Sequence, residues 1–223
     1  MPIDHKRING PDETVPYTLF TKLNTQSLSQ QFNKLICNGK RSDCRMPVEH
    51  RKIFLKTGVV SQAKGSAYIE LGKTKVILCK RRLHQQDAEE KQYSAIMKQS
   101  LESTVCRHEF PNFQVDIYAL VLHNDGSALS AAITAAGLAL SHAGVPMYDL
   151  ITSVTLGLQQ NMKLLDPNFA EQGLCEMPIS SNSENDNHGI ITISMLHTHE
   201  QISQFYQSGN ISLEDLNDSL KNP

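Results

Sequence analysis

The clearest pattern of apolar and polar positions lies in the middle of the chain. Between Val115 and Leu122, apolar side chains fall on both faces of an extended chain, a pattern typical of a strand covered on both sides. We therefore expect this strand to lie in the middle of a sheet.

Signals for a turn and a helix follow this strand at once. The residues Asn124-Asp125-Gly126 favour a tight turn, and either Asp125 or Ser127 is suited to cap a helix. Gly144, followed by Pro146, is a stop signal. The sequence therefore predicts one long helix that begins near Ser127 and ends before Gly144.

This helix is apolar around most of its circumference, which predicts that it is buried. Small residues recur along it at spacings of four and three, at Ala132, Ala136, Ala139 and Ala143. Together with Gly137 they allow another backbone to approach closely. The first turn of a buried helix presents free N–H groups and the positive end of the helix dipole, a natural site for an anion. Whether this helix start binds an anion is the central functional question.

The pattern predicts further strands and helices on both sides of this unit. Upstream, strands are expected at residues 53–55, 58–60, 65–71 and 74–79, with the last two forming a hairpin around Gly72-Lys73. An amphipathic helix over residues 85–103 is expected to cover the strand that starts at Val115. Downstream, strands are expected at residues 151–158 and 177–179, a half-buried strand at 189–196, and a last helix capped by Ser212.

Composition suits a globular protein, with 39% apolar and 20% charged residues in a chain of 223. We expect a mobile N-terminal tail over residues 1–24 and a single domain over residues 25–223. A net charge of −2 gives no overall signature of a nucleic-acid binder. The five scattered cysteines argue against a disulfide framework or a zinc site, and the polar N-terminus lacks a signal peptide. We expect a soluble protein in a reducing compartment.

Several clusters carry possible chemistry, and for most of them an ordinary surface role is favoured. Lys40 to Arg45 is a mixed-charge run, predicted to be a solvated loop. The dense basic run Lys80-Arg81-Arg82 could meet an RNA backbone, although exposed surface charge is the more frequent explanation. His197 and His199 are predicted to be a surface pair, since no further ligand completes a metal shell.

Motifs for phosphate loops and for a nucleophile elbow are absent from the sequence. Four carboxylates near predicted strand ends leave a metal site open without fixing a ligand geometry: Asp125, Asp166, Glu171 and Glu176. We therefore expect no metal and no cofactor.

Taken in order, four segments resemble the RNase PH family: residues 58–76, 125–136, 143–150 and Leu165-Asp166-Pro167-Asn168. Arg41-Ser42-Asp43-Cys44-Arg45 also looks like the family's Arg-x-Asp-Gly-Arg motif, with Cys44 in place of glycine. The resemblance covers roughly residues 41–196. It implies an α/β (α+β) fold with mixed sheets and a buried alanine-rich helix, in domains that close into a ring.

The same resemblance implies that the family's catalytic site is lost in this chain. In active members an arginine at the helix start holds the phosphate that attacks the RNA 3′ end, and Leu129 stands at that position. Leucine offers no charged donor, and the loss of such a clamp commonly costs roughly 10²-fold or more in rate. Active members also carry two aspartates after the Leu-Asp motif, whereas Glu171-Gln172 and Glu176 occupy this region with shortened spacing, and Gln172 cannot replace a catalytic carboxylate. Asp125 and Gly126 remain as parts of the former site, so the resemblance implies a protein that is not an enzyme.

The leading hypothesis is therefore a non-catalytic ring subunit of the RNA exosome. The resemblance implies other RNase PH-like subunits, S1/KH-type cap subunits and threaded RNA as partners, and the nucleus, nucleolus and cytoplasm as locations. A second hypothesis is an active phosphate-dependent 3′-exoribonuclease with a site shared with a ring partner, and a third is an RNA-binding module alone. The link after Cys79 is shorter than the family pattern, which puts one sheet edge and the loops that face RNA in question.

Overall fold

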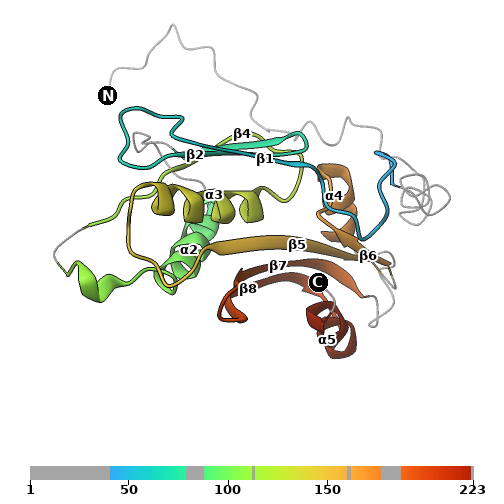
Figure 1. The fold of residues 1–223 in the computed structure, drawn as a ribbon. Helices are drawn as coiled ribbons and strands as arrows, with labels where there is room; N and C mark the ends of the chain where they lie inside the picture. The colour runs from blue at the N-terminus through green and yellow to red at the C-terminus, as the bar shows by residue number, and fades with distance from the viewer. Residues whose placement is uncertain (1–40, 79–87, 112–113, 160–161, 177–186, 222–223) are drawn as a thin grey trace, which may run out of the picture.

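The computed structural model describes residues 41–78, 88–111, 114–159, 162–176 and 187–221. Within them, two four-stranded sheets lie one above the other with helices between and beside them (Figure 1). Every strand pair in these residues is antiparallel. The predicted tail over residues 1–24 lies outside the described residues.

The first sheet has the order β1-β2-β3-β4 and the second the order β6-β5-β7-β8. The strands are β1 (Ile53–Thr57), β2 (Ala67–Leu71), β3 (Thr74–Leu78), β4 (Ala119–His123), β5 (Ile151–Gln159), β6 (Met162–Leu165), β7 (His188–Leu196) and β8 (Gln201–Asn210). The helices are α2 (Ala88–Glu102), a short 3₁₀ helix (Arg107–Glu109), α3 (Ala128–His142), α4 (Phe169–Glu176) and α5 (Leu213–Lys221).

Helix α3 is the predicted buried helix, and it forms the centre of the core between the two sheets (Figure 1). Ile133 is fully buried among side chains of both sheets, such as Ile69 and Ile151. A Cβ atom added to Gly137 would lie 2.6 Å from Cγ2 of Ile151, so the expected close approach is confirmed. Gly144, at φ +72°, ends the helix as predicted.

The strand predicted from Val115 to Leu122 is shorter and lies elsewhere in the sheet. Residues 114–118 form no strand, and β4 is an edge strand of the first sheet. Val121 and Leu122 are 42% and 52% exposed. The prediction of a central strand was wrong because a continuous apolar run does not distinguish a buried strand from the wall of a cleft.

Two further expectations in the first half of the chain need correction. Residues 58–60 are not a strand: Gly58, at φ +70°, lies in the connection that brings its N–H to the carbonyl of Ser66. Helix α2 packs against α3 and β8 instead of covering β4 directly. The hairpin of β2 and β3 around Gly72 is confirmed.

The second sheet also differs in part from the pattern. On β7, Ile191 is buried as expected, but the polar residues Thr192 and Ser194 are buried as well, whereas Ile193 and Met195 are partly exposed. Burial of these hydroxyls is possible because they bond to hydroxyls of Thr155 and Ser153 on the neighbouring strand β5. Strand β8 was missed, because its sequence QISQFYQSGN is largely polar.

The last helix is confirmed with its cap, since Oγ of Ser212 accepts from the N–H of Asp215. The strand predicted at 177–179 lies outside the described residues. Among the helices that the structure describes, none combines the length and the apolar character needed to cross a membrane.

Candidate functional site

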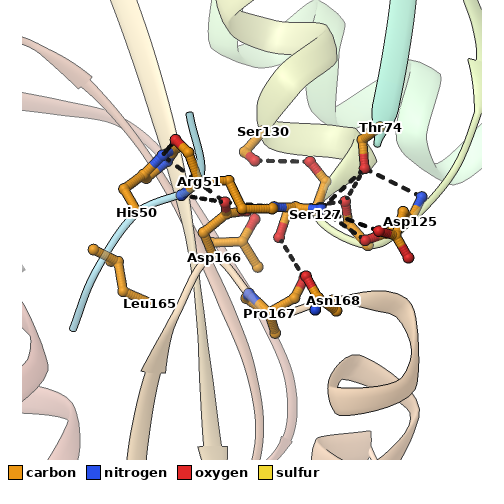
Figure 2. Close-up of polar contacts among 12 residues, drawn as sticks. His50, Arg51, Thr74, Asp125, Ser127, Ser130, Leu165, Asp166, Pro167 and Asn168 are labelled. Carbon is orange, nitrogen blue, oxygen red and sulfur yellow. Dashed lines mark hydrogen bonds and ion pairs between the residues drawn. The ribbon is translucent and has the colours of Figure 1, made fainter. Parts of the chain in front are cut away.

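The start of α3 lies at a tight turn that packs against the loop after β6. Gly126 has φ +87°, and a Cβ atom there would lie 2.4 Å from the carbonyl oxygen of Pro167. Ser127 also has a positive φ of 55°. Its hydroxyl donates to the carbonyl of Pro167 at 3.2 Å instead of capping the helix (Figure 2). The predicted side-chain cap by Asp125 or Ser127 is therefore wrong.

The cap comes from a distant residue instead. The backbone N–H of Ser127 donates to Oε1 of Gln172 on α4 at 3.2 Å. The Nε2 group of Gln172 in turn donates to Oε1 of Glu176 at 3.3 Å. One of the N–H groups at the helix start, the place where the sequence suggests an anion, is thus bonded to a neutral amide of the same chain.

A buried ion pair holds this turn in place. Arg51 donates to both carboxylate oxygens of Asp166 at 2.6 Å each, and neither side chain is more than 4% exposed (Figure 2). The same guanidinium donates to the carbonyls of Asp125 at 2.8 Å and Gly126 at 3.0 Å. One arginine therefore links the first sheet, the turn before α3 and the loop after β6.

The charge of Asp166 follows from this contact. Burial by itself would raise the pKa of the carboxyl, but the hydrogen bonds and charge of Arg51, with a smaller effect of His50, hold that pKa below its ordinary value of 3.8. Asp166 is therefore ionised at neutral pH and its oxygens are directed at Arg51. It serves as a structural anchor instead of a metal ligand.

A second buried pair corrects the expectation of a solvated loop at Lys40 to Arg45 for Arg41 alone, because Ser42, Asp43 and Cys44 are exposed as expected and Lys40 lies outside the described residues. Arg41 is buried and donates to both carboxylate oxygens of Glu171, at 3.0 and 2.8 Å, and to the carbonyl of Leu165. Cys44 has φ +65°, a backbone conformation that favours the glycine expected there. Composition alone missed Arg41, but its place in the Arg-x-Asp-x-Arg motif was a usable signal.

Three of the five predicted site positions, Leu129, Gln172 and Glu176, line a cleft of about 500 Å³ between α2, β4, the first turn of α3, α4 and the second sheet, whereas Asp125 and Gly126 are not among its lining residues. Leu129 lines it and packs partly against the core. Gln172 and Glu176 line it from α4, and the buried hydroxyls of Thr155 and Thr192 lie on its wall. Among the described lining residues there is no lysine, arginine or histidine, and two are glutamates, Glu90 and Glu176.

Other candidate residues do not join this site. His197 and His199 lie in the exposed turn after β7, where the N–H of Thr198 donates to Asp149. The described part of the chain contains no group of three or more side chains placed to hold a metal ion. The cysteines described as free are Cys44, Cys106 and Cys175, and burial raises the pKa of Cys175 to about 12, so its thiol is not a nucleophile. Lys80-Arg81-Arg82 lies outside the described residues.

Comparison with known proteins places this arrangement in a family. The model of the 3′ exoribonuclease family RNase PH, domain 1, matches residues 49–79 and 78–146. Exosome complex component MTR3 of Homo sapiens is 31% identical over 218 residues, covering 77% of this chain and 75% of the relative. The chain belongs to the RNase PH family. The two matched segments meet at residues 78–79, where the sequence places a shortened link.

A second relative and two solved structures are also similar to this chain. Exosome complex component RRP41-like of Arabidopsis thaliana is also 31% identical, over 209 residues that cover 81% of this chain and 77% of the relative. The fold matches the crystal structure of Rrp46 from rice, Oryza sativa, with a TM-score of 0.68 and 23% identity over 81% of this chain and 91% of that chain. It also matches the Archaeoglobus fulgidus exosome with RNA bound to the active site, at TM-score 0.68 and 17% identity over 87% of this chain and 92% of that chain.

Proposed function

We propose that this protein is a non-catalytic subunit of the core ring of an RNA exosome. The proposal is supported by membership of the RNase PH family and by relatives that are named as exosome components. The observation that carries the non-catalytic part is the character of the cleft at the start of α3.

Phosphorolysis of RNA needs cationic groups, because a phosphate anion must approach an anionic RNA backbone. The described residues that line this cleft provide two carboxylates and no cation. At the position of the family's phosphate-binding arginine, Leu129 contributes an apolar side chain. An approaching phosphate would therefore meet repulsion where an active member offers attraction.

The second support is the use of the former catalytic positions for structure. Gln172 accepts the N–H of Ser127 and donates to Glu176, so the former catalytic pair is engaged in holding α4 against the start of α3. An amide neither transfers a proton at neutral pH nor serves as an anionic metal ligand. The positions remain, but their chemistry is that of a helix cap.

In the ring, we expect other RNase PH-like subunits as neighbours, S1/KH-type subunits as caps and RNA in the channel. The proposed locations are the nucleus, nucleolus and cytoplasm. The expected role of this chain is to complete the wall of the channel while other proteins cut the RNA.

An assay of phosphorolysis tests the non-catalytic role. The full chain, alone and with co-expressed RNase PH-like partners, is incubated with 3′-labelled RNA and inorganic phosphate, and nucleoside diphosphates are separated by chromatography. We expect no product from the chain alone. In the assembly with partners, we expect nucleoside diphosphates to form at the same rate whether this subunit is the wild-type chain or its Gln172→Ala variant. A rate that falls tenfold or more with this change would instead favour a site shared between subunits.

A further inference from the structure

The cleft at the start of α3 is large for a site that has lost its chemistry. Its volume of about 500 Å³ lies in the range of ligand pockets. Its wall includes the buried pair of Thr155 and Thr192, whose hydroxyls bond to each other at 3.3 Å. These two buried polar groups therefore already have partners.

The walls of the cleft are apolar and aromatic. Three tyrosines line it from three different elements or connections: Tyr93 on α2, Tyr118 before β4 and Tyr206 on β8. Met97 and Leu129 also line the cleft. Tyrosines combine apolar area with a polar tip, and their ring faces attract cations, which makes such walls suited to protein segments.

The charge of the cleft selects one kind of occupant. Glu90 on α2 and Glu176 on α4 both line it and both are exposed, and neither forms an ion pair with a described residue. A polyanion such as RNA is repelled by these two carboxylates. A neutral apolar ligand would leave them without a counter-charge from the described residues. A cationic group flanked by apolar side chains complements both the two carboxylates and the apolar walls of the cleft.

We propose that this former active-site cleft is a docking site for an extended, basic segment of a partner protein, with arginine or lysine between apolar residues. The cation of that segment lies between Glu90 and Glu176, and its apolar side chains pack against the tyrosines and Leu129. This inference does not depend on membership of a ring, because it rests on the cleft of this chain alone.

Fluorescence anisotropy with the full chain tests the proposal. The probe is a fluorescein-labelled peptide in which two arginines alternate with leucines, and the reference peptide carries glutamates in place of the arginines. The variant is Glu90→Gln with Glu176→Gln. The matched control is Glu102→Gln with Glu109→Gln, which removes the same charge outside the cleft. Circular dichroism establishes that each variant is folded.

We expect saturable binding of the basic peptide, no binding of the acidic one, and about tenfold weaker binding by the cleft variant. The control variant is expected to bind within about twofold of wild type. Leu129→Arg, which adds a cation to the cleft, is also expected to abolish binding. Absence of binding by the wild-type chain, or equal loss in the cleft variant and the control, would overturn the proposal. Displacement of the peptide by a 12-nucleotide oligouridine would overturn it in favour of an RNA site.

Discussion

The backbone N–H of Ser127 and the side-chain oxygen of Gln172 are 3.2 Å apart and hydrogen-bonded, although 45 residues separate them in the chain. This bond joins the start of the buried helix α3 to helix α4. It occupies the N–H at a place where a helix start would otherwise attract an anion. Gln172, which we propose stands at a former catalytic position, here holds two helices together.

Removing this bond should lower stability without disrupting the fold. Gln172→Leu leaves the N–H of Ser127 without its acceptor, which we expect to cost about 1–2 kcal/mol of unfolding free energy. Chemical denaturation followed by circular dichroism measures this change. Gln99→Leu, on the exposed side of α2, is the matched control and is expected to stay within about 0.5 kcal/mol of wild type. Equal stabilities for the two variants would contradict the helix-cap role of Gln172.

The ion pair of Arg51 and Asp166 should dominate the stability of the site. Asp166→Asn removes the counter-charge of the buried Arg51 guanidinium, which also donates to the carbonyls of Asp125 and Gly126. We expect a loss of about 3–5 kcal/mol at neutral pH, the range for breaking a buried pair. Asp43→Asn, at a more exposed carboxylate that pairs with Arg45, is expected to cost less than about 1 kcal/mol.

The same pair predicts a specific pH dependence. Because the pKa of Asp166 in the folded protein lies below its ordinary value of 3.8, its contribution is fully present well above pH 3.8 and is lost as the pH falls below that value. The difference in unfolding free energy between wild type and Asp166→Asn should therefore be constant from pH 7 to about pH 5 and then shrink toward pH 3. Urea denaturation at each pH measures it. A difference that grows on acidification would contradict the assigned direction of the pKa shift.

Two glycines should respond in opposite ways to alanine. Gly137→Ala places a Cβ atom 2.6 Å from Cγ2 and 3.1 Å from the carbonyl oxygen of Ile151, so we expect a loss of about 1–3 kcal/mol despite the better helix propensity of alanine. Gly173→Ala, in α4, meets nothing within 4 Å and should gain up to about 1 kcal/mol. Thermal denaturation compares the two. A stabilising Gly137→Ala would show that α3 and β5 are less closely packed than the structure indicates.

Periodicity in the sequence was sufficient to find α3, the hairpin of β2 and β3, strand β5 and the Ser212 cap, because each depends on local spacing or on turn residues. It failed for β8, whose polar residues belong to a strand stabilised by its pairing with β7. It also failed for the two faces of β7, because buried hydroxyls such as Thr192 satisfy one another across strands. Local propensity carries no information about such distant partners.

In the candidate site, too, residues in sequence motifs could be identified in advance, whereas residues that depend on distant partners could not. Leu129, Gln172 and Glu176 were identified from their places in family motifs, and the structure brings all three to one cleft. Arg51 carried no signal in the sequence, since its partner Asp166 lies 115 residues away. Arg41 was misjudged because a mixed-charge run usually lies in solvent, and only the fold supplies the buried carboxylate of Glu171 that allows its burial.

Native mass spectrometry of the full chain, co-expressed with the other RNase PH-like exosome subunits of the same organism, tests whether this protein is a ring subunit. We expect assemblies in which each copy of this chain adds 24.9 kDa to a defined set of RNase PH-like partners. Detection of this chain only as a monomer or as assemblies of itself, under conditions in which the other subunits associate with one another, would contradict it.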